Sequence, residues 1–134
     1  MQHTQSRPKV VIVGGGFAGI EVVKTLRKLG TSVDITVVSK SPTFEYYPAL
    51  YKLVTGALPI EVSVPLATVF RSDKVQLVQA TYTGLDSARQ VISVVDSTGV
   101  SQEISYDYLI LALGSETNFF NIKGLSELSH SFKS

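Results

Sequence analysis

A glycine-rich turn that follows a short apolar strand is the feature that most constrains how this chain folds. Residues 10–19 read Val-Val-Ile-Val-Gly-Gly-Gly-Phe-Ala-Gly, so β-branched residues run directly into a Gly-x-Gly-x-x-Gly pattern. Gly14 permits the tight turn out of the strand, Gly16 lets backbone N–H groups approach a pyrophosphate, and Gly19 lets the next helix pack against the strand. The flanking strand and helix and the N-terminal placement agree, so the pattern predicts a dinucleotide site rather than an ordinary turn.

The residues around this turn predict a βαβ unit. A strand is expected over Lys9 to Val13, a helix over Phe17 to Leu29 with Gly30 as its C-cap, and a second strand over Ser32 to Val38. The apolar helix residues expected largely on one face are Ala18, Ile20, Val22, Val23, Leu26 and Leu29. The crossover is right-handed, and the helix N-terminus, whose dipole favours negative charge, faces the phosphates.

The remainder of the chain predicts a change from parallel to antiparallel structure. The expected elements are a loop at Ser39 to Pro48, short helices at Ala49 to Thr55 and Val64 to Phe70, strands at Val75 to Ala80, Ala80 to Leu85, Gln90 to Asp96 and Gln102 to Tyr106, and a buried strand at Tyr108 to Leu113 before Gly114. Short strands joined by polar turns are typical of a meander. The predicted fold class is therefore α/β: a Rossmann-like βαβ domain with a parallel sheet and a small antiparallel β-meander.

Composition excludes several classes of function. The 134 residues fit one domain, and a net charge of +1 argues against a nucleic-acid partner. There is no cysteine, which excludes a disulfide framework, a thiolate nucleophile and a redox-active Cys pair. His3 and His130 are expected to be surface residues, so no metal site is predicted. No apolar run suggests a signal peptide or a transmembrane segment, and the chain is expected to be cytoplasmic.

Ser39 occupies the position where an acidic residue normally binds the adenosine ribose in such a unit. Its hydroxyl can still bond a ribose hydroxyl, and the adjacent Lys40 can meet a 2′-phosphate, so an NADP-type site remains an alternative. Equally, Ser39 can begin the loop while Lys40 is solvated. The sequence alone does not choose between these interpretations.

Residues 44–51, Phe-Glu-Tyr-Tyr-Pro-Ala-Leu-Tyr, carry four aromatic side chains in eight positions. Such a cluster more often belongs to a core than to a cofactor site. Its place just after the second strand, beside the expected crevice, instead favours a functional role. Both interpretations are kept here.

Four segments together resemble a known family. They are residues 10–19, 35–38, 47–58 (Tyr-Pro-Ala-Leu-Tyr-Lys-Leu-Val-Thr-Gly-Ala-Leu) and 106–115 (Tyr-Asp-Tyr-Leu-Ile-Leu-Ala-Leu-Gly-Ser). In this order they resemble the FAD-binding N-terminal half of the type II NADH dehydrogenases, which are pyridine nucleotide-disulfide oxidoreductase-like proteins. The segment at 106–115 is the most specific of the four.

The resemblance implies which residues contact FAD. The glycine-rich turn would hold the pyrophosphate, Ser39 and Lys40 would border the ribose, backbone groups around Thr81 and Tyr82 would meet the adenine, and the end of the last strand would lie against the dinucleotide. The implied cofactor-binding residues are Gly14, Gly15, Gly16, Phe17, Ala18, Gly19, Ser39, Lys40, Thr81, Tyr82, Ala112, Leu113 and Gly114. Two residues depart from the family pattern, Ser39 in place of an acid and Leu113 in place of threonine.

The resemblance also implies what this chain lacks. Full-length members carry a second Gly-x-Gly-x-x-Gly domain for NADH and a membrane-binding C-terminal region, so residues 1–134 correspond to a single, partial FAD-binding domain without the NADH-binding domain. The implied function is an NAD(P)H dehydrogenase that passes electrons through FAD to a quinone or similar acceptor, with NAD(P)H and quinone reached through a missing domain or second chain. Members are peripheral to the inner face of the membrane. No catalytic acid or base is assigned.

A second hypothesis belongs to a different class of function. The chain can be a non-catalytic nucleotide-binding or assembly module for FAD, NADP or an ADP-ribose compound, completed by another chain as a homo- or hetero-oligomer. Lys40 and the absence of an acid at Ser39 favour this reading.

Overall fold

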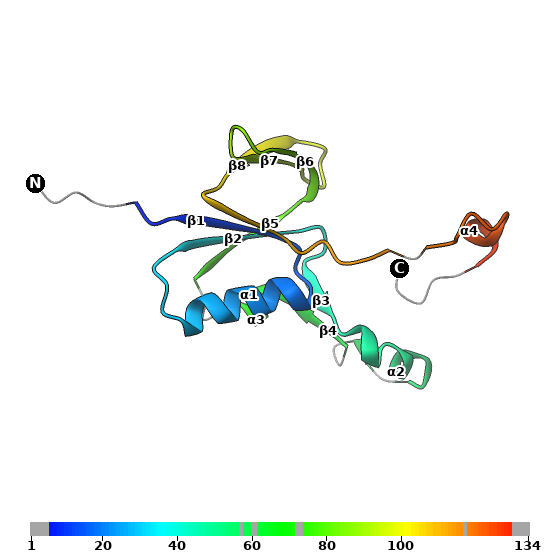
Figure 1. Ribbon diagram of the computed structural model, residues 1–134. Helices are drawn as coiled ribbons and strands as arrows, with labels where there is room; N and C mark the ends of the chain where they lie inside the picture. The colour runs from blue at the N-terminus through cyan, green and yellow to red at the C-terminus, as the bar shows by residue number, and fades with distance from the viewer. Residues whose placement is uncertain (1–5, 57, 60–61, 72–73, 117, 130–134) are drawn as a thin grey trace, which may run out of the picture.

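A four-stranded parallel sheet forms the centre of the protein (Figure 1). The structure, a computed structural model, describes residues 6–56, 58–59, 62–71, 74–116 and 118–129. The strands are β1 (Lys9–Val13), β2 (Asp34–Ser39), β5 (Val75–Gln79) and β9 (Tyr108–Leu111), in the order β5-β2-β1-β9. All neighbouring pairs in this sheet are parallel. Both faces of such a sheet are covered, which explains the nearly uninterrupted apolar sequences of β1 and β2.

Helix α1 (Phe17–Lys28) covers one face of the sheet, on the same side as the short α3 (Leu66–Val69) (Figure 1). Ile20 and Val23 of α1 pack with Ile12, and with further sheet residues, in the first core cluster. The predicted helix is confirmed to within one residue, and Gly30 follows it with a φ of +67°. Two residues expected on the apolar face, Ala18 and Leu29, are instead exposed.

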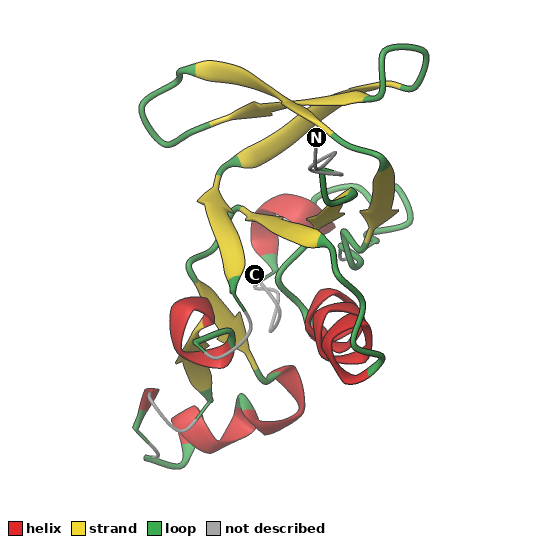
Figure 2. Ribbon diagram, turned by 90° about the vertical axis from the view of Figure 1, so that its left-hand side faces the viewer, coloured by secondary structure: helices red, strands yellow, loops and turns green. Residues whose placement is uncertain are grey.

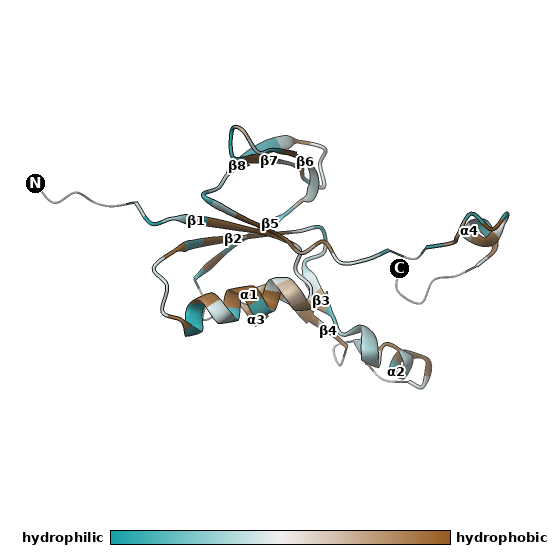
Figure 3. Cartoon of the chain, in the orientation of Figure 1, coloured by the Kyte–Doolittle hydropathy of each residue, from teal (hydrophilic) through white to brown (hydrophobic). Residues whose placement is uncertain are grey.

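The predicted meander is confirmed and covers the opposite face of the sheet. It consists of β6 (Thr81–Asp86), β7 (Val91–Val95) and β8 (Ser101–Ser105), paired antiparallel. Figure 2 shows it as a separate layer beyond the parallel strands. Ile92 and Val94 of β7 are fully buried and pack in a second core cluster with Val11 and other residues of the parallel sheet. Figure 3 shows the resulting concentration of apolar residues along the central strands.

The segment between β2 and β5 differs from the prediction. It contains a hairpin of β3 (Thr43–Glu45) and β4 (Ser63–Pro65), where a loop and the start of a helix were expected. Between these strands lie a 3₁₀ turn (η1, Tyr47–Ala49) and α2 (Tyr51–Val54), shorter than the helix predicted at 49–55. Strands of three residues have no detectable period, so only pairing with a partner some 20 residues away defines them. The described part of this segment, residues 43–56, 58–59 and 62–65, is called the β3–β4 excursion below.

Two further differences concern the end of the chain. The last strand ends at Leu111 rather than Leu113, and it is partly exposed rather than buried as predicted, because no further strand of the described residues pairs with its outer edge. A short helix, α4 (Leu125–Leu128), follows and was not predicted. Both α2 and α4 project beyond the body of the protein (Figure 1).

Asp107 joins the first and last strands of the sheet. Its carboxylate accepts a hydrogen bond from the backbone N–H of Lys9 at 2.6 Å, and its own N–H donates to the Lys9 carbonyl at 2.9 Å. This reciprocal pair lies immediately before the parallel register Val10↔Tyr108. The aspartate of the Tyr-Asp-Tyr segment therefore helps to set the alignment of β9 beside β1, at the end of the sheet opposite the glycine-rich turn.

Candidate dinucleotide site

The carboxyl ends of the four parallel strands bring the predicted site residues to one edge of the sheet. From β1 the chain continues to β2 and then β5 on one side, whereas β9 returns on the other side. The strand order therefore reverses between β1 and β9. Ligands of open α/β sheets bind in the crevice outside the carboxyl ends of the strands at such a switch point. The turns after β1 and after β9 flank this crevice.

Gly14 and Gly19 are required by contacts within the protein. Gly14 has a φ of +121°, and a Cβ there would overlap the carbonyl oxygen of Ala112. A Cβ on Gly19 would overlap the carbonyl oxygen of Gly14. The tight turn at Gly14 and the close packing of α1 at Gly19 are thus confirmed. They bring the β1–α1 turn against Ala112 at the end of β9.

Gly15 has a role that the glycine pattern does not reveal. A Cβ at this position would lie 2.5 Å from Leu66 Cδ1 and 2.9 Å from Ser39 Oγ. Leu66 is buried and begins α3, and its N–H donates to the Pro42 carbonyl at 2.9 Å. The side of the turn that faces α3 and the end of β2 is therefore filled. No signal in the sequence near Gly15 identifies Leu66 as its neighbour.

Gly16 is open where the other glycines of the turn are packed. It is the N-cap of α1 with a φ of −85°, and a Cβ there would meet no atom within 4 Å. No side chain caps the helix, and the first turn contains no acidic residue. The first N–H groups of a helix lack intrahelical partners and favour an anion. The N-terminus of α1 therefore has open space and unpaired N–H groups of the kind that an anion needs.

Ser39 and Lys40 follow β2 at the same edge. The Ser39 hydroxyl donates to the Ser41 carbonyl at 2.7 Å, so it shapes the loop, while its oxygen retains acceptor capacity. Lys40 is exposed and lines a pocket of about 230 Å³. The same pocket is lined by Thr81, by Asp96 and Ser97 of the β7–β8 turn, and by Gln79, Ala80 and Val95.

Asp96 is a charged member of this pocket that the sequence reasoning missed. Its Oδ1 accepts hydrogen bonds from the Thr98 hydroxyl at 2.7 Å and from the backbone N–H groups of Thr98 and Val100 at 2.8 and 2.9 Å. The hydroxyl bond, followed by the N–H of Val100, lowers the pKa of Asp96 from the usual aspartate range. The pocket therefore contains a carboxylate as well as the Lys40 ammonium.

The remaining predicted residues lie close to the crevice in different ways. Thr81 is exposed at the start of β6, whereas the side chain of Tyr82 packs with the second core cluster and leaves its backbone for any adenine contact. After β9, Leu113 is 59% exposed and Gly114 has a φ of +77°. Of the residues 44–51, Phe44 packs against the core, whereas Tyr46, Tyr47 and Tyr51 are exposed.

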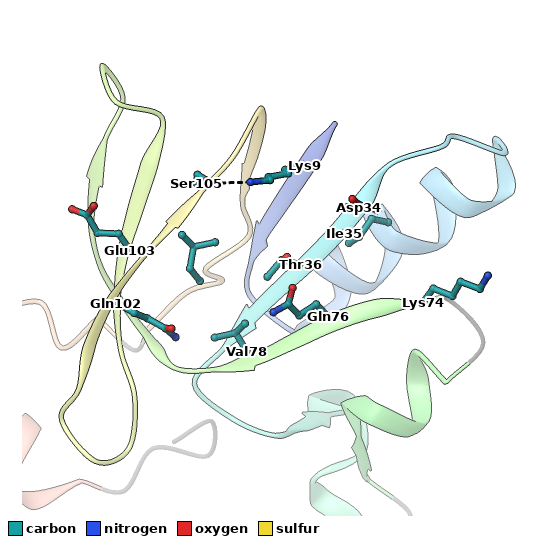
Figure 4. Close-up of a pocket in the computed structure, with 11 residues that line it drawn as sticks. Lys9, Asp34, Ile35, Thr36, Lys74, Gln76, Val78, Gln102, Glu103 and Ser105 are labelled. Carbon is teal, nitrogen blue, oxygen red and sulfur yellow. Dashed lines mark hydrogen bonds between the residues drawn. The ribbon is translucent and has the colours of Figure 1, made fainter. Parts of the chain in front are cut away.

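A larger hollow, of about 550 Å³, lies between the parallel sheet and the meander, away from the glycine-rich turn (Figure 4). Most of its polar lining is exposed, and Lys9 Nζ donates to Ser105 Oγ at 3.2 Å. Glu103 points away from this hollow in Figure 4 and pairs with Arg89 through two hydrogen bonds of 3.0 and 2.7 Å, which lower the pKa of Glu103. The residues that line this hollow form a solvated cleft between the two layers, and none of them is a predicted site residue.

Within the described ranges, no group of three or more His, Asp or Glu side chains is arranged to hold a metal ion. His3 and His130 lie outside the described residues. Over the same part of the chain, no helix has the length and apolar character needed to cross a bilayer.

The fold and the crevice define a Rossmann-type nucleotide-binding domain, and comparison with known proteins identifies its family. Residues 8–134 match the pyridine nucleotide-disulphide oxidoreductase model, and the chain belongs to this family of oxidoreductases. It is 30% identical over 135 residues to demethylphylloquinone reductase NdbB of Synechocystis sp., covering 97% of this chain and 33% of that protein. It is 32% identical over 126 residues to a type II NADH:quinone oxidoreductase of Staphylococcus haemolyticus, and this match covers 92% of this chain and 30% of that protein.

Solved structures agree with the sequence matches. NDH2 from Plasmodium falciparum, in complex with NADH, superposes with a TM-score of 0.79 at 25% identity over 90% of this chain and 25% of that one. The sulfide:quinone oxidoreductase of Aquifex aeolicus superposes with a TM-score of 0.76 at 30% identity, over 90% of this chain and 27% of that one. The predicted resemblance to type II NADH dehydrogenases is confirmed, and the chain spans about a third of the length of its curated relatives.

Proposed function

We propose that this chain is the FAD-binding portion of an NAD(P)H dehydrogenase that passes electrons to a quinone or similar acceptor. The observation that carries the proposal is the uncapped N-terminus of α1 beside the open Gly16, at the switch point between β1 and β9. The backbone of residues 14–19 would hold the pyrophosphate. Lys40, Thr81 and the 230 Å³ pocket would receive the adenosine, and residues 112–114 would lie along the dinucleotide.

The flavin, when bound, would supply hydride acceptance and electron transfer. The residues of this chain bind and orient it, which is the usual contribution of a protein to cofactor chemistry. No side chain here is assigned as an acid or base. The relatives named above as NADH:quinone and demethylphylloquinone reductases support a quinone as the acceptor.

The proposed site is completed by polypeptide outside residues 1–134. Strand β9 pairs with β1 on one side and has no strand on the other among the described residues. Tyr108, Leu111 and Leu113 expose 62%, 48% and 59% of their surfaces along this edge and beyond it. Exposed apolar residues on a sheet edge favour a covering partner. A further segment or a second chain would cover this edge.

One experiment tests whether the cofactor is FAD. The purified chain is incubated with FAD, passed through a gel-filtration column, and examined for retained flavin absorbance, while mass spectrometry identifies the released compound. We expect FAD to remain bound and NADH oxidation with a soluble quinone to stay at the level of free FAD, because nothing positions the nicotinamide. A colourless protein would refute flavin binding by residues 1–134 themselves, and rapid turnover would refute the partial-site assignment.

An NADP- or ADP-ribose-binding module is the second candidate, and Lys40 is the observation that favours it. A 2′-phosphate near Lys40 would share the pocket with the negatively charged Asp96 carboxylate, which would repel it. Ribose hydroxyls avoid this repulsion, so FAD is preferred. Tighter binding of NADPH than of FAD, lost on Lys40→Ala, would reverse the order of the two candidates.

A further inference from the structure

Three aromatic side chains connect the glycine-rich turn to the β3–β4 excursion. The ring of Phe17 lies 4.9 Å from that of Phe44 at an interplanar angle of 88°, and 5.7 Å from that of Tyr46 at 61°. Both are edge-to-face arrangements, the favoured geometry for such rings. Phe17, Phe44 and Tyr46 are called the aromatic cluster below. It brings together residues separated by almost 30 positions in the sequence.

Phe17 belongs both to the N-terminus of α1, through its backbone, and to the aromatic cluster, through its side chain. It is the first residue of α1, so its N–H is among those that the helix leaves for an anion. Its side chain, 51% exposed, extends away to the aromatic cluster. Any ligand that fixes the backbone at the helix N-terminus therefore also fixes the origin of this ring.

The other two rings belong to the base of the excursion. Phe44 lies on β3 opposite Val64 of β4 and packs against the first core cluster. Tyr46 follows β3, and its N–H donates to the Val62 carbonyl at 2.7 Å. The Tyr46 carbonyl then accepts from the N–H of Ala49, the buried last residue of η1, at 2.9 Å. Tyr46 is thus hydrogen-bonded both to the residue before β4 and to the turn that leads into α2.

We propose that Phe17 is a positioning residue that couples anion binding at the glycine-rich turn to the placement of the β3–β4 excursion. The inference rests on the proposed nucleotide site and adds a consequence of binding there. The projecting part carries the exposed Tyr51, Leu53 and Val54, which bound nucleotide would hold in one position relative to the crevice. Coupling between two sites is reciprocal, so loss of the contact between Phe17 and the excursion must also weaken the binding of the ligand at the glycine-rich turn.

Tyr46 provides the sharpest test because it lies outside the glycine-rich turn. ADP is the probe, since it contains the pyrophosphate and adenosine without a flavin, and its affinity is measured by calorimetry. We expect Tyr46→Ala to weaken ADP binding by about threefold to tenfold, the range for loss of aromatic pairs. Tyr46→Phe retains the ring and should restore the affinity to within about twofold. Tyr51→Ala is the matched control, because this exposed tyrosine of the same excursion makes no ring contact within the described residues.

Trypsin cleavage after the exposed Lys52 of α2 gives an independent measurement. ADP should slow this cleavage in the wild type and in Tyr46→Phe. The expected factor is about the same as the loss of ADP affinity in Tyr46→Ala, because the rate of cleavage follows the population of molecules in which the excursion has left its position beside Phe17. The protection should disappear in Tyr46→Ala. A purely structural role for Tyr46 would raise the rate of cleavage without removing its dependence on ADP.

The outcomes separate the two proposals. If ADP does not bind the wild type, the nucleotide site itself is overturned and the coupling with it. If ADP binds but Tyr46→Ala behaves like Tyr51→Ala in affinity and in protection, only the coupling is overturned. In the double variant Phe17→Leu/Tyr46→Ala, an affinity loss no greater than that of the larger single variant supports the coupling, and an additive loss contradicts it.

Discussion

The two ends of the parallel sheet differ in what forms the space beside them: side chains line the larger cleft, whereas a constrained backbone turn borders the candidate site. At one end, a cleft of about 550 Å³ is lined by exposed side chains such as Gln76 and Gln102. At the carboxyl end the adjoining pocket is smaller, about 230 Å³, but the turn beside it contains backbone positions that only glycine satisfies. Exposed side chains move at little cost, whereas a packed backbone does not. Constraint on the backbone, rather than volume, marks the candidate site.

The largest expected effect follows from substitution at the most constrained position of the turn. Gly14→Ala places a side chain at a φ of +121° and against the Ala112 carbonyl. We expect a loss of about 4 kcal/mol in the free energy of unfolding, from strain and overpacking together. Urea denaturation measures it, with Gly16→Ala as the control because that position has neither problem. A loss below about 1 kcal/mol in Gly14→Ala would remove the contrast between the two ends.

Gly16→Val tests the open side of the same turn. Because its φ is −85° and no atom lies within 4 Å of the added Cβ, the variant should fold like the wild type. The branched side chain would occupy the path of the phosphates, and we expect FAD and ADP to bind at least about 100-fold more weakly. Gly84→Val is a matched control, since a Cβ at Gly84 makes only an ordinary contact with Ser93. Unchanged affinity in a folded Gly16→Val protein would refute the proposed site.

Asp107 tests the opposite end of the sheet, where a side chain rather than a glycine determines the alignment. Asp107→Ala removes the acceptor for the N–H of Lys9, and we expect the free energy of unfolding to fall by about 1–2 kcal/mol. Asp107→Asn keeps an acceptor and should recover most of the loss. Thermal and urea unfolding give both values. If instead Asp107→Ala retained full stability, the reciprocal pair with Lys9 would not contribute to the register of β9.

The smallest effect is expected in the larger cleft. Gln102→Ala should change the free energy of unfolding by no more than about 0.5 kcal/mol, as is usual for exposed positions. The affinity for FAD should stay within about twofold of the wild type. Calorimetry and urea unfolding measure the two quantities. A marked loss of FAD affinity would show that the cleft belongs to the nucleotide site, and the contrast between the two ends of the sheet would then fail.

The elements with a local sequence signal are predicted correctly. β1, α1 and β2 follow from apolar runs and a glycine cap, and the meander follows from short strands separated by polar turns. Strands β3 and β4 are not predicted, because each has three residues and exists only through its pairing with the other. Ala18 and Leu29 share the apolar stripe of α1 but lie near its two ends, and both are exposed there.

The sequence by itself determined the βαβ unit and the glycine-rich turn, because backbone freedom and side-chain periodicity act over a few residues. Only the tertiary structure decided which distant groups complete them. Leu66 fills the space beside Gly15, Asp96 enters the pocket of Lys40, and Phe17 meets Tyr46. Asp107 pairs with Lys9 across 98 positions. Such contacts depend on the order and register of strands, which no local pattern specifies.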